Sequence, residues 1–195
     1  MTKKTNILFL VKKMGIYGEP YSPSKNTGLT NAVTILADEL RREYKANIAV
    51  EVCIDSNEID KYVHKYKPDF CILEAIWTTP VKMKEITALH RGVVFITRVH
   101  SKFPFLAQEG NAIGWLKEIN KLPNSYVSFN NIDTNKDAER IGIVDPIYLP
   151  NVYKKILHVP TLKERLYFYN QKSKKEKIIN IGCFGSIRPL KNQLL

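Results

Sequence analysis

The chain has 195 residues, of which 44% are hydrophobic and 25% charged, and its formal net charge is +11 at pH 7. This length suits one domain of moderate size, or one domain and part of a second, and the hydrophobic fraction excludes a disordered chain. The uninterrupted apolar runs, such as residues 7–11, are far shorter than the roughly 20 residues of a membrane-spanning helix. We therefore expect no such helix.

The N-terminal segment and the cysteines predict a cytoplasmic protein. The apolar stretch at residues 7–11 is followed at once by lysines and has no small-residue cleavage site, so it indicates a first strand and not a signal peptide. Cys53, Cys71 and Cys183 each lie in an apolar strand-like run without a CxxC motif, which favours buried, reduced thiols. The four histidines are scattered and no Asp-x-Asp occurs, so we expect no metal and no other cofactor.

Apolar runs alternate with segments of helical periodicity along the first 150 residues. The predicted strands are residues 6–11, 47–54, 69–74, 93–99, 125–129 and 147–149. The predicted helices lie between them and carry start signals such as Asp55 with Glu58, Thr79 with Pro80, and Thr134 with Asp137. This alternation predicts an α/β fold with a Rossmann-like, doubly wound parallel sheet.

The first strand is followed by a long polar loop that contains Gly15 and Gly18, and then by an amphipathic helix at residues 29–44. A strand, a glycine-containing loop and a helix N-terminus together can direct backbone N–H groups at an anion such as a phosphate. The glycines form neither GxGxxG nor a P-loop, so a flexible surface loop is the alternative interpretation.

Polar residues follow two buried strands of the predicted sheet: Glu74 ends the third strand, and His100 and Ser101 follow the fourth. The crevice outside the carboxyl ends of parallel strands is where ligands bind in such sheets. The same edge is expected to gather residues 15–25, 74–77, 100–102 and 130–131. Glu74 and His100 are therefore candidate ligand-binding residues, although solvated turn residues would fit the same positions.

The C-terminal fifth of the chain is strongly basic. Residues 153–191 contain ten Lys or Arg against two Glu, a net charge of +8. Such a segment can attract anionic lipid, a phosphorylated substrate or nucleic acid, and a plain solvated linker is an equally good interpretation. No RNA- or DNA-binding module pattern accompanies it, so we do not expect nucleic-acid binding; peripheral contact with an anionic membrane stays open.

Four segments of the chain occur in the order in which one known protein family has them: EAIWTTPVK, RVHSKFPFLAQEG, YLPNVY and INIGCFGSIRPLKN. Through these segments the chain resembles a GT-B glycosyltransferase of the glycosyltransferase family 4 (group 1) type. The resemblance covers most of the chain. It implies an N-terminal Rossmann-like domain that binds the acceptor, a second such domain that binds a nucleotide sugar, and reaction in the cleft between them without a metal.

The resemblance also implies roles for individual residues. Gly185 and Lys191 match the glycine turn and the lysine that grip the donor diphosphate; Ser186 stands where the family usually has arginine, and Arg188 lies two residues later. His100 matches a histidine that faces the donor sugar. The catalytic candidates are His100 and Glu74, the donor or phosphate candidates are Gly15, Gly18, Gly185, Arg188 and Lys191, and the acceptor candidates are Trp77 and Ser101. Trp77 could equally be a core residue.

The same resemblance divides the chain into an acceptor domain at residues 1–152, a basic linker at 153–176, and the first strand and turn of a truncated donor-binding domain at 177–195. Since the later Glu-containing donor motif is missing, we expect this chain alone not to transfer sugar.

The partners would be a nucleotide sugar and an acceptor. The alternatives are a non-enzymatic binding module that uses the basic tail, which a salt-dependent gel shift would reveal, and another ligand-binding Rossmann-like protein.

Overall fold

The structure is a computed structural model, and it describes residues 4–13, 28–152 and 163. Contacts divide the chain into two units, Met1–Lys154 and Lys155–Leu195, and every element described below belongs to the first unit. The predicted glycine loop with Gly15 and Gly18, the basic linker, and the C-terminal strand with Cys183, Gly185, Arg188 and Lys191 lie outside the described residues.

The described part of the first unit alternates strands and helices as predicted. Its elements are β1 (Asn6–Lys12), α1 (Gly28–Tyr44), β2 (Asn47–Cys53), α2 (Glu58–Tyr66), β3 (Phe70–Glu74), α3 (Pro80–Leu89), β4 (Val94–Val99), α4 (Phe103–Leu106), α5 (Ala112–Asn120), β5 (Ser125–Phe129), α6 (Ile132–Arg140) and β6 (Ile147–Tyr148). Among these described helices, none has the length and apolar character needed to cross a membrane.

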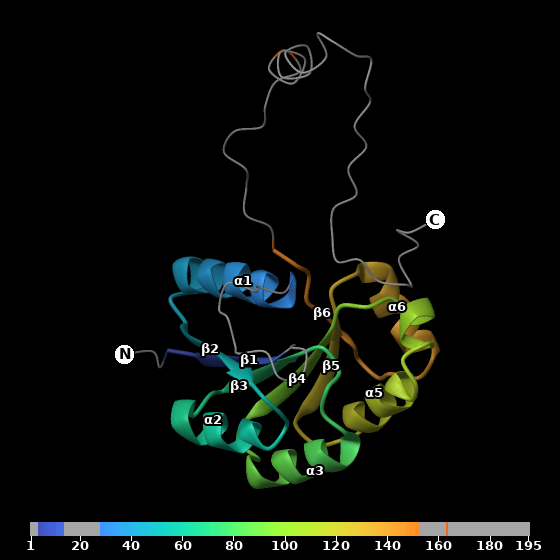
Figure 1. Ribbon diagram of the computed structural model, residues 1–195, viewed down its shortest axis with the longest axis horizontal. Helices are drawn as coiled ribbons and strands as arrows, with labels where there is room; N and C mark the ends of the chain where they lie inside the picture. The colour runs from blue at the N-terminus through green and yellow to red at the C-terminus, as the bar shows by residue number, and fades with distance from the viewer. Residues whose placement is uncertain (1–3, 14–27, 153–162, 164–195) are drawn as a thin grey trace, which may run out of the picture. The chain divides into compact units, whose positions relative to one another are not determined.

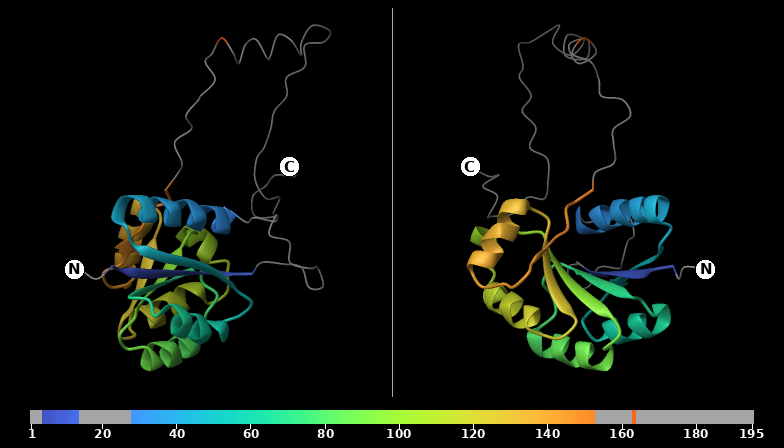
Figure 2. Two further views of the ribbon diagram at one scale, coloured as in Figure 1. Left: turned by 90° about the vertical axis from the view of Figure 1, so that its left-hand side faces the viewer. Right: turned by 180° about the vertical axis from the view of Figure 1, so that it is seen from behind.

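The six strands form one all-parallel sheet with the order β2-β1-β3-β4-β5-β6. The chain moves from β1 outward to β2, returns past β1 to β3, and then continues in one direction. Right-handed crossovers therefore place α1 on one face and the later helices on the other. Figures 1 and 2 show α1 on one side of the sheet and α2 and α3 on the opposite side. The doubly wound α/β prediction is confirmed.

Two apolar clusters fill the two faces of the sheet, because successive side chains of a strand point to opposite sides. Leu8 and Leu10 of β1 join the larger cluster under α2, α3 and α5, whereas Phe9 and Val11 join the smaller cluster under α1. Since both faces are covered, the central strands are mostly apolar, as parallel strands usually are, and the buried charged exceptions Glu74 and Arg98 lie at the carboxyl ends of β3 and β4.

Helix ends differ from the sequence predictions at two places. Asn131, and not Thr134, caps α6: its Oδ1 accepts hydrogen bonds from the backbone N–H groups of Asp133 and Thr134, both at 3.0 Å. The predicted capping box of α2 is also absent, since the Glu58 carboxylate accepts from the N–H of Ile54 at 2.6 Å and not from that of Asp55. Thr79 caps α3 as predicted, with Pro80 at its first position.

Cys53 and Cys71 are free, fully buried thiols, and we expect neither to react with Ellman's reagent at pH 8 in the native protein. Burial raises the pKa of Cys53 to about 12 and raises that of Cys71 as well, so almost no thiolate forms. The measurement uses a Cys183→Ser variant, in which both remaining thiols should react only after urea unfolds the protein. Reaction at the unfolded rate in native buffer would contradict their burial.

The same shifts predict how stability depends on pH. The unfolded chain loses these thiol protons near the ordinary pKa of 9.0, whereas the folded protein keeps them to higher pH. The contribution of the two thiols is therefore fully present below pH 9 and is lost as the pH rises from there toward about 12.

Candidate functional site

A buried ion pair joins the carboxyl ends of β3 and β4. Glu74 and Arg98 are register partners on these adjacent strands, so their side chains leave the sheet on the same face. Both side chains are fully buried, and Nη1 of Arg98 lies 3.2 Å from Oε1 of Glu74. Charged side chains are almost never fully buried without a partner, and here each supplies the partner of the other.

Arg98 also binds the segment that follows β6. Its Nε donates to the carbonyl oxygen of Leu149 at 3.3 Å, and its Nη2 donates to the carbonyl oxygen of Pro150 at 2.8 Å and to Oδ1 of Asn151 at 2.9 Å. All three nitrogens of the guanidinium are thus used. Arg98 therefore fixes the segment after β6 across the end of the sheet, and this brings Asn151 next to the residues that follow β4.

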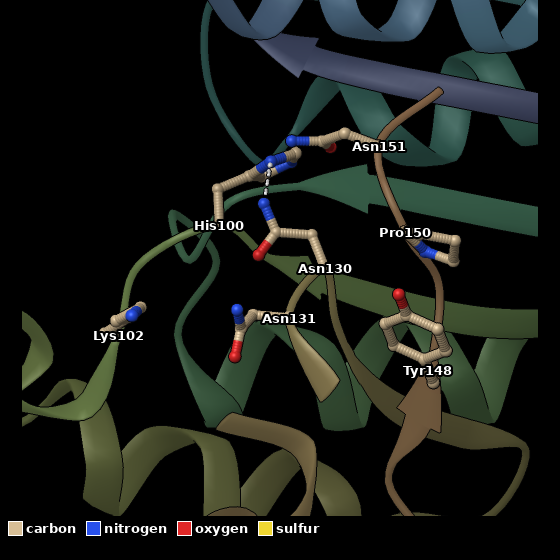
Figure 3. A pocket seen from close by; sticks show the side chains of 7 residues that line it. All are labelled: His100, Lys102, Asn130, Asn131, Tyr148, Pro150 and Asn151. Carbon is tan, nitrogen blue, oxygen red and sulfur yellow. Dashed lines mark hydrogen bonds between the residues drawn. The ribbon is translucent and has the colours of Figure 1, made fainter. Parts of the chain in front are cut away.

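The Glu74 carboxylate in turn orients His100. Oε2 of Glu74 lies 2.5 Å from Nε2 of His100, and Nδ2 of Asn130, which follows β5, lies 3.5 Å from Nδ1 of the same ring. In the neutral imidazole, these contacts assign the proton to Nε2, which donates to the carboxylate, and leave Nδ1 as an acceptor. His100 is thus held between a buried carboxylate and a side-chain amide, as Figure 3 shows for Asn130.

The backbone turns sharply directly after Glu74. Ala75 has φ of 73°, in the left-handed region that residues with a Cβ seldom adopt, and its N–H donates to the carbonyl oxygen of Arg98 at 2.9 Å. The strand end that carries Glu74 is therefore pinned by backbone as well as side-chain bonds to β4. Such strained positions often accompany functional sites, which is consistent with a site at this edge.

A pocket of about 380 Å³ opens beside His100 at the carboxyl edge of the sheet (Figure 3). Its size falls within the range of small-molecule sites, and it lies where ligands bind in open α/β sheets. It is lined by His100 and Lys102 after β4, Asn130 and Asn131 after β5, and Tyr148, Pro150 and Asn151 in and after β6.

The lining offers many hydrogen-bonding groups and one cation. Amide, imidazole and phenol groups can donate to and accept from a hydroxyl-rich ligand, and the ammonium group of exposed Lys102 can pair with an anion. Asn131 and Asn151 are each held through Oδ1, by the N-terminus of α6 and by Arg98 respectively. Both amides are therefore oriented before any ligand arrives.

The structure brings only some of the predicted site residues together. His100 lines the pocket, and Glu74 lies directly behind it. Glu74 is not a solvated turn residue, since it is fully buried and both of its oxygens are engaged; this favours a role in positioning His100 over direct contact with a ligand. Ser101 lies next to His100 in the chain but is not a lining residue.

Trp77, the other acceptor candidate, lies outside the pocket lining. It packs against the large apolar cluster, and its Nε1 donates to the carbonyl oxygen of Glu74 at 3.0 Å. These contacts fit the alternative that Trp77 is a core residue, and they give it a part in fixing the end of β3.

Sequence reasoning missed Arg98, Tyr148, Pro150 and Asn151 as parts of this site. Arg98 had a detectable signal, because an arginine inside the apolar run of β4 requires a buried partner. The other three residues carry no comparable signal. Their place in the site depends on the path of the chain after β6, which local sequence does not specify.

A scan against protein-family models found no match for this chain, and a search of curated proteins also found none.

Proposed function

We propose that the unit Met1–Lys154 is the acceptor-side part of a nucleotide-sugar-dependent glycosyltransferase of the GT-B type. With a donor-binding domain present, the enzyme would transfer a sugar from a nucleoside diphosphate to an acceptor hydroxyl. The observation that carries the proposal is the pocket in which the imidazole of His100, oriented by the buried Glu74–Arg98 pair, lies among side-chain amides.

The chemistry of the pocket supports a sugar as ligand. Sugar hydroxyls both donate and accept hydrogen bonds. A site with preoriented amides favours ligands that bond to those amides, because a ligand without matching groups would leave the amides without hydrogen-bond partners. Nε2 of His100 is taken by Glu74, so a sugar hydroxyl would donate to Nδ1 by displacing the long, 3.5 Å contact from Nδ2 of Asn130. Lys102 would pair with a phosphate oxygen.

Glu74 and Arg98 would act through His100. The carboxylate fixes the ring and its tautomer, and the guanidinium balances the carboxylate charge in a place that water does not reach. A carboxylate behind a histidine is also the arrangement that supports a histidine as proton acceptor, so His100 could assist the acceptor hydroxyl as it loses its proton.

The experiment that tests the proposal is a binding screen on the full chain by isothermal titration calorimetry. Its panel contains UDP-glucose, UDP-N-acetylglucosamine, GDP-mannose and the corresponding free sugars. We expect saturable binding of at least one member, weakened about tenfold or more by Asn130→Ala or Lys102→Ala through loss of a hydrogen bond or of a charge-assisted contact.

Lys121→Ala is the matched control, because Lys121 is also an exposed lysine but follows α5 and does not line the pocket. It should bind like the unaltered chain. The absence of saturable binding across the panel at about 10 mM, or equal affinities for all variants, would count against a sugar site here. The alternative of a binding module that uses the basic tail rests on residues outside the described ones and stays a prediction.

A further inference from the structure

A second group of ligand-type side chains lies away from the pocket, on the face that α2 and α3 cover. Asp60 and His64 lie one turn apart on α2, and His90 directly follows α3. Oδ1 of Asp60 lies 2.7 Å from Nε2 of His90 and 3.2 Å from Nδ1 of His64, and the ligand atoms of all three residues lie within 4.8 Å of one another. Two histidines that are scattered in the sequence are thus brought to one carboxylate.

His90 is held firmly in this position. Its N–H bonds to the carbonyl oxygen of Ile86, and its own carbonyl oxygen accepts from the N–H of Val93 and from Nδ2 of Asn124. Its side chain is only 11% exposed, and its ring packs against Phe95. Helical spacing places Asp60 and His64 on the same face of α2. Nδ1 of His64 also lies 3.1 Å from the carbonyl oxygen of Asp60, so the exposed ring would turn from that contact to meet an ion.

We propose that Asp60, His64 and His90 bind a divalent transition-metal ion of the Zn²⁺ class. Two imidazole nitrogens and one carboxylate oxygen form a ligand set that Zn²⁺ uses, with water in the fourth position. The separation of 3.2 Å is close to the roughly 3.3 Å between neighbouring ligands of a tetrahedral ion with bonds of about 2.0 Å, whereas the 2.7 Å hydrogen bond between Asp60 and His90 would lengthen as the ion replaces its proton. The side chains of His64 and Asp60 are 71% and 46% exposed, which leaves room for the ion and its water.

The surrounding charges permit a cation at this place. Lys61 and Lys65, the lysines beside the site on α2, are paired with Glu58 at 3.5 Å and with Glu51 at 3.0 Å. Arg91 follows His90 but is exposed, so solvent and salt screen its charge. The carboxylate of Asp60 is the negative charge that the site itself supplies to the ion.

An ion at this site would connect α2 to the end of α3. Because a ligand that binds only the folded state stabilises it by mass action, Zn²⁺ should raise the melting temperature. The site shares no residue with the pocket beside His100, so its occupancy and the proposed sugar binding can be tested independently.

The test is a calorimetric titration of the tag-free full chain with Zn²⁺ after dialysis against EDTA, supported by visible spectroscopy with Co²⁺. We expect saturable binding of one ion per chain, an absorption band typical of tetrahedral Co²⁺, and a higher melting temperature with Zn²⁺. His64→Ala and Asp60→Asn should each bind Zn²⁺ at least about tenfold more weakly. Removing a residue that only orients a metal ligand already lowers metal affinity by about that factor, and removing a ligand itself should lower it at least as much.

Lys61→Ala is the matched control on the same helix, since its side chain is 64% exposed and supplies no ligand. It should bind Zn²⁺ like the unaltered chain. His64→Ala is the deciding variant because its exposure allows it to fold normally, which circular dichroism would verify. No saturable binding of Zn²⁺ below about 1 mM, or unchanged affinity in His64→Ala, would overturn the proposal and leave the three residues as an ordinary hydrogen-bonded group.

Discussion

Replacing Arg98 by methionine is expected to lower the free energy of unfolding by about 3–5 kcal/mol. The substitution leaves the Glu74 carboxylate buried with only His100 as partner, and a buried charge without compensation is strongly destabilising. It also removes the donors that bind the carbonyl oxygens of Leu149 and Pro150. Urea unfolding followed by circular dichroism measures the loss.

Arg140→Met is the matched control for this prediction. Arg140 pairs with Asp137 at 2.9 Å, but the two side chains are 77% and 52% exposed, and exposed pairs contribute at most about 1 kcal/mol. A double substitution, Glu74→Leu with Arg98→Met, should be less destabilising than Arg98→Met alone, because it removes both charges together. Equal stability losses for Arg98→Met and Arg140→Met would contradict the buried pair.

The second large effect concerns activity. In a version of the protein that carries a donor-binding domain, His100→Ala should reduce sugar transfer by about 10²-fold, as the loss of a positioned acid–base group typically does. The variant also loses the hydrogen bond from Nε2 to Glu74, so we expect the free energy of unfolding to fall by about 1–3 kcal/mol. Initial rates per folded molecule separate the two effects.

His100→Gln is the informative companion variant, because its amide can still donate to Glu74. It should recover much of the stability but little of the activity, since the Nδ1 acceptor is not restored. If His100→Ala instead unfolds easily and keeps full activity per folded molecule, the histidine serves only the fold and the site assignment is wrong.

The sheet was predictable because each strand is a short apolar run that can be recognised from its own sequence. β5, for example, is the short run Ser125–Phe129 between polar turn residues, and the sequence prediction has the same bounds. The choice of cap for α6 was not predictable, since Asn131 and Thr134 are both residue types that cap helices. Only the three-dimensional path of the backbone before α6 shows that Asn131 is the capping residue.

The candidate site was only partly predictable for a similar reason. Glu74 and His100 follow from the rule that ligands meet the carboxyl ends of parallel strands. The pairing of Glu74 with Arg98 depends on the register between β3 and β4, and neither strand specifies that register by itself. The approach of Asn151 depends in turn on Arg98, because the guanidinium holds the segment after β6 in place.

Nuclear magnetic resonance of the side-chain amide groups tests the central claim most directly, namely that the pocket beside His100 binds a sugar-containing ligand. In a titration of the ¹⁵N-labelled chain with UDP-glucose, UDP-N-acetylglucosamine, GDP-mannose and the corresponding free sugars, at least one ligand should shift the Nδ2 signals of Asn130, Asn131 and Asn151 together, with a common dissociation constant. The Nδ2 signal of Asn124, which bonds to carbonyl oxygens before β4, should stay in place. Unchanged pocket signals with every ligand, or shifts at Asn124 in their place, would contradict the account.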